Sequence, residues 1–203
     1  VPIQIIIFLF TVYYFLIGVN GLWRKKEKKI LTPQKTFAVI VAAHNESAVI
    51  GQLVDNLKML DYPKELYDIF VIADNCTDNT AQIARDCGAI VHERFNDKER
   101  GKGFAMEWMF ARLFEMKRKY DAVAIFDADN LVYIRFLLEM NNRLCKGDKL
   151  VQGYLDAKNP YDTWVSGTFA IAFWVIDHIW HLAKTNIGLS SVIGGTGMCI
   201  TTD

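Results

Sequence analysis

The chain has 203 residues, with 23 Lys and Arg against 23 Asp and Glu, and 52% of its residues are hydrophobic. This hydrophobic content excludes a disordered chain, which combines low hydrophobicity with a high net charge. The formal net charge of zero argues against a general nucleic-acid-binding protein, because such proteins usually carry a basic surplus. We therefore expect a folded protein with no nucleic-acid partner.

The charges are distributed unevenly along the chain. Residues 1–23 carry none, residues 24–29 carry five basic groups and one acidic group, and the remaining residues carry 18 basic and 22 acidic groups. About 20 apolar residues can cross the hydrocarbon core of a bilayer, so residues 1–23 predict a single transmembrane helix. A signal peptide is disfavoured, because its positive charges would precede the apolar stretch and a cleavage site would follow it.

The basic residues after this helix predict its orientation. By the positive-inside rule, they place the N-terminus outside and the rest of the chain on the cytoplasmic side of the cell membrane. They should also attract anionic head groups, so membrane lipids are an expected partner. We treat residues 24–36 as a basic juxtamembrane linker and residues 37–203 as the domain that carries the function.

In residues 37–203, apolar runs of strand length alternate with longer segments of helical period. The expected strands are 37–42, 68–73, 89–92, 122–126 and 150–154. The expected helices are 48–60, 80–87, 103–119 and 131–145. This alternation is typical of an α/β domain with a mostly parallel sheet flanked by helices. The aromatic, mostly apolar segment 164–182 predicts an amphipathic helix that lies on the bilayer surface or against the core.

Polar clusters follow the first, second and fourth expected strands, at residues 44–47, 74–80 and 127–130. In open α/β sheets, ligands bind at the carboxyl ends of the strands. The three clusters therefore predict one binding site at one edge of the sheet.

The sharpest of these clusters is Asp127-Ala128-Asp129. Carboxylates that leave coordination positions open suit Mg²⁺ or Mn²⁺, which then bridge to phosphate oxygens. A short Asp-x-Asp motif is also common in solvated turns, so the motif alone leaves both interpretations open.

Two further positions suggest contacts with a nucleotide. Asp74 ends a buried type of strand, where a carboxylate can accept a hydrogen bond from a ribose hydroxyl or a base N–H, although an Asx-turn is the alternative. Lys102 lies between Gly101 and Gly103 before an expected helix, which aims a cation and a helix N-terminus at anionic oxygen. A solvated loop explains this second motif equally well. Asp78 or Asn79 is expected to cap the next helix.

Four segments, in this order, resemble the membrane-anchored family 2 inverting glycosyltransferases of the GT-A fold: 39–46, 71–80, 100–105 and 126–129. The resemblance implies a GT-A-like nucleotide-binding domain that transfers sugar from a UDP-sugar to a hydroxyl of a saccharide or lipid-linked acceptor. It implies the following nucleotide-sugar-binding residues: Ala42, His44, Asn45, Glu46, Asp74, Lys102 and Asp127. It also implies Mg²⁺ or Mn²⁺ on Asp127 and Asp129. Gly195, Thr196 and Gly197 resemble the family's Gly-Thr-Gly segment, which lines the acceptor pocket.

The resemblance also implies features that would follow Asp203. The family's general base, in a Thr-Glu-Asp-like motif, and its Gln-x-x-Arg-Trp motif both belong there. We therefore expect residues 37–203 to be an incomplete domain, with an inactive enzyme as the alternative.

Two functions of other classes stay open, a sugar-nucleotide nucleotidyltransferase and a catalytically silent membrane-bound module that binds nucleotide sugars. The first would usually carry a Gly-rich basic loop after its first strand, which His44-Asn45-Glu46-Ser47 does not resemble.

Overall fold

The computed structural model describes residues 2–23 and 30–203. The basic residues 24–29, from which the membrane orientation was predicted, lie outside the described residues. The chain divides into two compact units, one made of Val1–Lys28 and Tyr154–Ile193, the other of Lys29–Gly153 and Gly194–Asp203.

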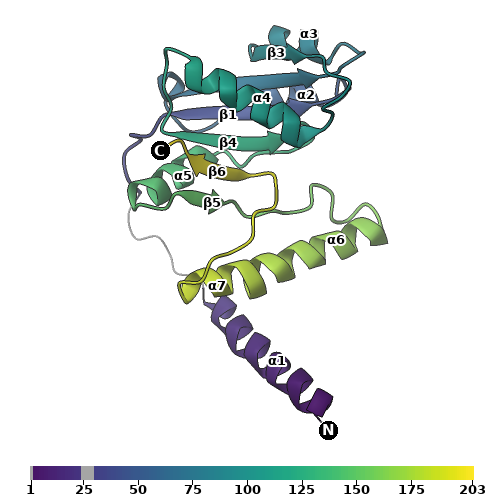
Figure 1. Ribbon diagram of the computed structural model, residues 1–203, viewed down its shortest axis with the longest axis vertical. Helices are drawn as coiled ribbons and strands as arrows, with labels where there is room; N and C mark the ends of the chain where they lie inside the picture. The colour runs from purple at the N-terminus through teal and green to yellow at the C-terminus, as the bar shows by residue number, and fades with distance from the viewer. Residues whose placement is uncertain (1, 24–29) are drawn as a thin grey trace. The chain divides into compact units, whose positions relative to one another are not determined.

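The larger unit is built on a sheet of six strands within the described residues, in the order β3-β2-β1-β4-β6-β5 (Figure 1). The strands are β1 Phe37–Ala43, β2 Tyr67–Asp74, β3 Ile90–Arg94, β4 Ala122–Asp127, β5 Leu150–Gln152 and β6 Met198–Thr201. β1 pairs in parallel with β2 and β4, and β2 pairs in parallel with β3. β6 runs antiparallel to both β4 and β5. The expected α/β fold with a mostly parallel sheet is confirmed.

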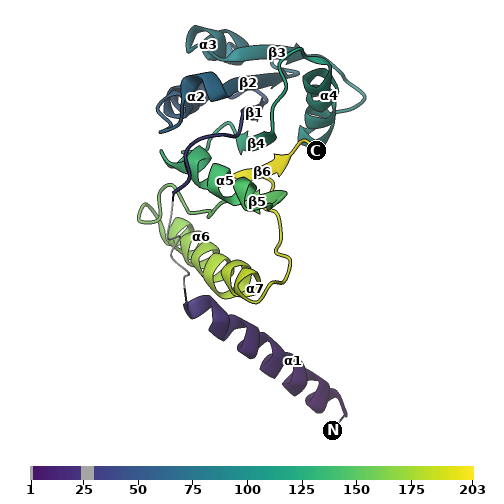
Figure 2. The ribbon, with the colours of Figure 1, turned by 90° about the vertical axis from the view of Figure 1, so that its left-hand side faces the viewer.

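Helices cover both faces of this sheet, because its central strands are apolar on both faces. The helices are α2 Ile50–Lys58, α3 Thr80–Asp86, α4 Lys102–Glu115 and α5 Phe136–Cys145, with a short 3-10 turn η2 at Lys64–Leu66. Side chains alternate along β1, so Val39 and Val41 join one core with α2, α3 and α5. Ala38 and Ile40 join the other core with α4. Figure 2 shows α2 and α3 on one side of the sheet and α4 on the other.

Two helix boundaries differ clearly from the expectation, since α4 ends at Glu115 instead of residue 119 and α5 begins late. α5 begins at Phe136, whereas the sequence pattern predicted a helix from residue 131. The side chain of Asn56 explains the difference, because it occupies the backbone groups of Val132. Asn56 Oδ1 accepts from Val132 N at 2.6 Å, and Asn56 Nδ2 donates to Val132 O at 3.1 Å. These bonds hold the segment between β4 and α5 outside the helix.

The smaller unit combines the N-terminal helix with a second apolar helical segment. It contains α1 Pro2–Val19, η1 Asn20–Leu22, α6 Trp164–Val175, the π-helical η3 Ile176–Leu182 and α7 Ala183–Asn186. The rings of Tyr14 and Trp180 pack with their centroids 4.9 Å apart. A Cβ on Gly21 would lie 2.0 Å from the carbonyl oxygen of His178, so only glycine permits this close approach.

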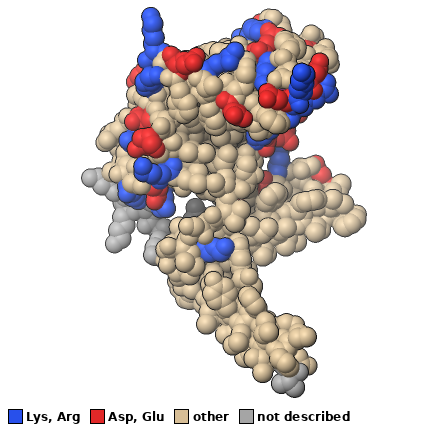
Figure 3. Space-filling model, viewed as in Figure 1, with Lys and Arg blue, Asp and Glu red and all other residues tan. Residues whose placement is uncertain are grey.

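The surface of this unit is mostly apolar. Pro2–Leu22 has 21 residues and a mean hydropathy of 2.1, so it is long and apolar enough to cross a membrane. Figure 3 shows no Lys, Arg, Asp or Glu on the described part of α1. α6 carries no charged residue and exposes large side chains such as Trp164, which is 83% exposed. The expectation of an amphipathic helix is therefore wrong for α6, whose apolar surface is not confined to one face.

Candidate functional site

The loops that follow β1 and β2 are joined by hydrogen bonds. His44 Nδ1 lies 2.7 Å from the carbonyl oxygen of Asp74. Asn45 Oδ1 accepts from Thr77 N at 2.8 Å, and the backbone of Asn45 takes a φ of 55°, in the left-handed region that Asn tolerates better than most residues. The structure therefore brings three of the expected nucleotide-binding residues, His44, Asn45 and Asp74, to one edge of the sheet.

The loops after β1 and β2 are also joined at the residues that follow. Glu46 N donates to Thr80 Oγ1 at 2.8 Å, and Asp78 Oδ2 accepts from Ser47 N at 3.2 Å. The N-cap residue of α3 is Asn79, whose side chain makes no capping bond; Asp78 Oδ1 instead accepts from the first helical amide, Thr80 N, at 3.0 Å. Hydrogen bonds from Thr80, and then from Ser47, hold the pKa of Asp78 well below its usual range. Asp78 is thus an ionised structural residue of this edge.

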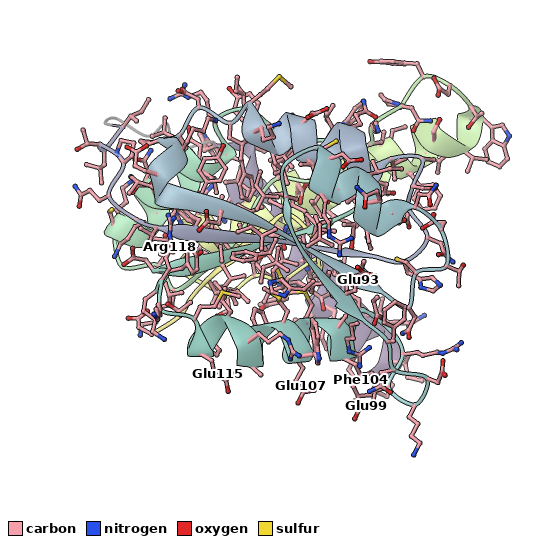
Figure 4. All side chains as sticks on the ribbon, turned by 90° about the horizontal axis from the view of Figure 1, so that it is seen from above. Glu93, Glu99, Phe104, Glu107, Glu115 and Arg118 are labelled. Carbon is pink, nitrogen blue, oxygen red and sulfur yellow. The ribbon has the colours of Figure 1, made fainter. Side chains whose placement is uncertain are left out.

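Asp74 forms a buried ion pair that the sequence did not predict. Asp74 and Arg94 are neighbours in the register of β2 and β3, and they are only 6% and 3% exposed. Arg94 Nη1 donates to Asp74 Oδ1 at 2.7 Å, and Arg94 Nη2 donates to the carbonyl oxygen of Glu99 at 2.8 Å. Figure 4 shows Phe104 in the first turn of α4 and, beside it in this view, Glu99 of the loop that precedes α4. The expected strand ended at residue 92, so Arg94 lay outside it. Its basic side chain, two positions later, was the one sequence signal for an ion pair with Asp74.

A second cluster lies where β4 ends. Lys102 Nζ donates to Asp127 Oδ1 and, at 2.8 Å, to the carbonyl oxygen of Gly195. Asp127 N donates to Thr196 Oγ1 at 3.0 Å. Ala42 is the register partner of Asp127 on β1. The structure therefore joins Asp127 and Lys102 with the Gly-Thr-Gly segment, across 69 residues from Asp127 to Thr196 and 93 from Lys102 to Gly195.

Two polar side chains hold this segment in place, Gln152, which the sequence did not single out, and Asn130, which ends the predicted polar cluster 127–130. Gln152 Oε1 accepts from Gly194 N at 2.8 Å, and Gln152 Nε2 donates to Thr196 O at 2.9 Å. Asn130 Oδ1 accepts from Asp127 N at 3.1 Å and from the Thr196 hydroxyl. Gly195 has a φ of 80°, which costs glycine little and other residues more. No local sequence pattern predicts contacts between residues so far apart.

The donor atoms at the end of β4 suit a hard divalent cation. Asp127 is half-buried, and Asp129 is exposed with a single hydrogen bond, from Asn130 Nδ2 at 3.4 Å, within the described residues. The described residues 2–23 and 30–203 contain no group of three or more His, Cys, Asp or Glu side chains placed to hold a metal. Two carboxylates with other positions left to phosphate oxygens and water still fit Mg²⁺ or Mn²⁺ in ligand type. The ammonium group of Lys102 balances the charge of Asp127 in this structure.

Comparison with known sequences points to one family. The family described as "Glycosyltransferase like family 2" matches residues 33–203. A β-monoglucosyldiacylglycerol synthase of Nostoc sp. is 32% identical over 122 residues, which are 58% of this chain and 25% of that protein. The chain thus spans about a quarter of the length of that relative.

Solved structures agree in fold. A mannosyltransferase of Pyrobaculum calidifontis, solved with GDP-Man and Mn²⁺, superposes with a TM-score of 0.67 at 19% identity, over 94% of this chain and 51% of that one. A glucosyl-3-phosphoglycerate synthase of Mycobacterium tuberculosis, solved with Mn²⁺, UDP and phosphoglyceric acid, gives a TM-score of 0.55 at 19% identity, over 88% of this chain and 62% of that one. At such low identity these matches establish the fold, which is GT-A-like.

Proposed function

The chain belongs to glycosyltransferase-like family 2, and on that premise we propose that it transfers a sugar from a UDP-sugar to a hydroxyl of a saccharide or lipid-linked acceptor. The observation that carries this proposal is the joining of three strand ends at one edge of the sheet. Asp74 lies at the end of β2, and Asp127 at the end of β4 contacts Lys102. Ligands of open α/β sheets bind at this kind of edge.

In the proposed complex, the loops after β1 and β2 hold the nucleoside. Ala42, His44, Asn45 and Glu46 line one side, and the Asp74 carboxylate accepts a hydrogen bond from the base. Support comes from the bonds that tie these two loops together, such as His44 to Asp74 and Glu46 to Thr80. A loop that is already fixed loses less conformational entropy when the ligand binds.

The diphosphate would lie over the end of β4. Asp127 and Asp129 would hold Mg²⁺ or Mn²⁺ there, and such an ion would neutralise the charge that develops on the departing diphosphate. Lys102 is half-exposed and contacts Asp127, so it needs only a change of side-chain rotamer to offer its ammonium group to a phosphate oxygen. The related structures solved with Mn²⁺ support a divalent metal in this fold.

The transfer itself is proposed as a single displacement with inversion. The acceptor oxygen forms a bond to the anomeric carbon while the bond from that carbon to the UDP oxygen breaks, and the hydroxyl proton passes to a general base. Gly195, Thr196 and Gly197 would line the acceptor side, where Gln152 binds the backbone of Thr196 and Asn130 accepts from its hydroxyl.

We further propose that α1 anchors the enzyme as a single transmembrane helix in the cell membrane, with the larger unit on the cytoplasmic side. The length and apolar composition of Pro2–Leu22 support a span. The Nostoc relative is named for a diacylglycerol lipid, which supports a lipid acceptor at a membrane surface.

Product analysis tests the proposed activity. The purified protein is incubated with UDP-glucose, UDP-galactose or UDP-N-acetylglucosamine, with Mn²⁺, and with diacylglycerol or oligosaccharide acceptors. UDP release that rises with an acceptor supports the transferase. Pyrophosphate release from UTP and a sugar phosphate would support a nucleotidyltransferase instead. Binding of UDP-sugars without either product would support a silent binding module.

A further inference from the structure

Lys102 connects the end of β4 to the Gly-Thr-Gly segment. It is the first residue of α4, and Gly101 before it takes a φ of 107°, which glycine adopts readily. The Lys102 ammonium group donates to the carboxylate of Asp127 and, at 2.8 Å, to the carbonyl oxygen of Gly195. These two acceptors together form a place for one cation, which the ammonium group fills.

The ion pair between Lys102 and Asp127 is built to be exchanged. Within residues 2–23 and 30–203, Lys102 is the one ion-pair partner of Asp127, and the two side chains are 36% and 43% exposed. Ion pairs that are exposed to this extent contribute little free energy, and the flexible lysine stem has several rotamers. Lys102 can therefore leave Asp127 whenever a stronger anion is offered to its ammonium group.

The carboxylate that Lys102 holds is also the proposed ligand of Mg²⁺ or Mn²⁺. An ammonium group that is hydrogen-bonded to one oxygen of Asp127 lies close to any divalent cation bound by the same carboxylate. Like charges that are close together in a partly buried site repel each other. Lys102 therefore weakens metal binding for as long as it stays on Asp127. A diphosphate ends this competition, because its oxygens are strong acceptors for an ammonium group.

We propose that Lys102 makes metal binding conditional on the donor nucleotide. Lys102 holds Asp127 and Gly195 until a diphosphate draws its ammonium group away, and the Asp127 carboxylate is then fully available to the divalent cation. On the metal Lys102 acts through Asp127, whereas it binds the nucleotide directly. This role rests on the proposed function, in which the end of β4 binds the diphosphate together with Mg²⁺ or Mn²⁺.

The proposed role differs from simple phosphate binding in one measurable quantity, the affinity for Mn²⁺ without nucleotide. If Lys102 only bound phosphate, its removal would weaken UDP binding and leave the affinity for Mn²⁺ alone unchanged. If Lys102 competes with the metal, its removal strengthens the binding of Mn²⁺ alone and weakens the binding of UDP. The two ligands then respond in opposite directions to one substitution.

Lys102→Met separates these possibilities, because methionine has a similar shape and no charge. Binding of Mn²⁺ to the purified full chain is measured by electron paramagnetic resonance, which detects the free ion. We expect Lys102→Met to bind Mn²⁺ without nucleotide roughly tenfold more tightly than the unmodified protein does. UDP, titrated at saturating Mn²⁺, should bind to this variant about tenfold more weakly, because a charge-assisted hydrogen bond is lost.

Three controls accompany this substitution. Arg100→Met removes a positive charge two positions earlier that pairs with Asp97, so it should leave both affinities unchanged. Lys102→Arg keeps a charged donor beside Asp127, so Mn²⁺ alone should bind as weakly as to the unmodified protein. In Lys102→Met combined with Asp127→Ala, the gain in Mn²⁺ affinity should disappear, because the ion has lost its carboxylate ligand.

The outcomes separate this role from the proposed function. Equal or weaker binding of Mn²⁺ alone to Lys102→Met would overturn the role and leave the transferase intact, and so would an equal gain in Arg100→Met. One comparison requires no variant: equal affinity of the unmodified protein for Mn²⁺ with and without UDP, after subtraction of the Mn²⁺ bound by UDP itself, would also overturn the role. Absence of Mn²⁺ and UDP binding to every protein tested would contradict the proposed function itself.

Discussion

At the residue scale, the buried ion pair between Arg94 and Asp74 contributes to the stability of the larger unit. Removing one partner of a buried ion pair leaves the other charge without compensation, which typically costs about 3–5 kcal/mol. We therefore predict that Arg94→Met lowers the free energy of unfolding by about 3–5 kcal/mol, measured by urea denaturation in detergent.

Arg100→Met is the matched control for this measurement. Arg100 pairs with Asp97 at 2.8 Å, but both side chains are well exposed, and exposed pairs contribute about 0–1 kcal/mol. Similar losses in the two variants would contradict the prediction, because they would show that burial does not increase the contribution of the Asp74–Arg94 pair to the free energy of unfolding.

The residues of the candidate site differ in whether the sequence alone could predict them. Asp74, Asp127 and Lys102 were singled out because each lies at a strand end or before a helix, and these positions are visible in the local pattern. Arg94 and Gln152 were missed, and the contact of Asn130 with Thr196 was not foreseen, because their partners are distant in sequence. Gln152 contacts Thr196 across 44 residues, and Asn130 contacts Thr196 across 66. Only the folded sheet brings such pairs together.

At the scale of elements, the parallel strands were predictable and the antiparallel strand was not. β1 is an uninterrupted apolar run, and β2 and β4 contain apolar runs at 69–73 and 122–126, as expected for strands that are buried on both faces. β6 has only four residues, Met198–Thr201, and follows a glycine-rich loop, so its pattern resembles many other short apolar runs.

Burial of Cys199 in β6 raises the pKa of its thiol to about 12, so the thiol is neutral at neutral pH and serves as a core side chain.

The apolar helices allow a prediction about the membrane. If α1 spans the bilayer with the larger unit in the cytoplasm, protease added to the cytoplasmic face of sealed vesicles should digest that unit. Protease added to the opposite face should leave it intact. A variant that lacks residues 2–22 should be extracted from the membrane more readily, and its extraction in alkaline carbonate is the control. A larger unit resistant to protease at the cytoplasmic face would contradict this topology.

At the scale of the whole molecule, the neutral net charge is the sum of unlike parts. The described part of α1 is free of charge, whereas acidic and basic side chains are mixed over the larger unit (Figure 3). Part of that acidity belongs to the candidate site, at Glu46, Asp74, Asp127 and Asp129. In the proposed function, a metal-bound nucleotide diphosphate would bring both the cation that compensates these carboxylates and the anion that Lys102 would bind.

The most direct test of this account is the metal dependence of UDP binding, expressed as the ratio of the UDP dissociation constants in EDTA and in Mn²⁺. The ratio is informative because Asp127→Ala also frees Lys102, which could then bind phosphate without a metal. We predict a ratio of tenfold or more for the unmodified protein and for the surface control Asp55→Ala. The ratio should fall close to one in Asp127→Ala and in Asp129→Ala. An unchanged ratio in both site variants would contradict a metal-dependent donor site at the end of β4.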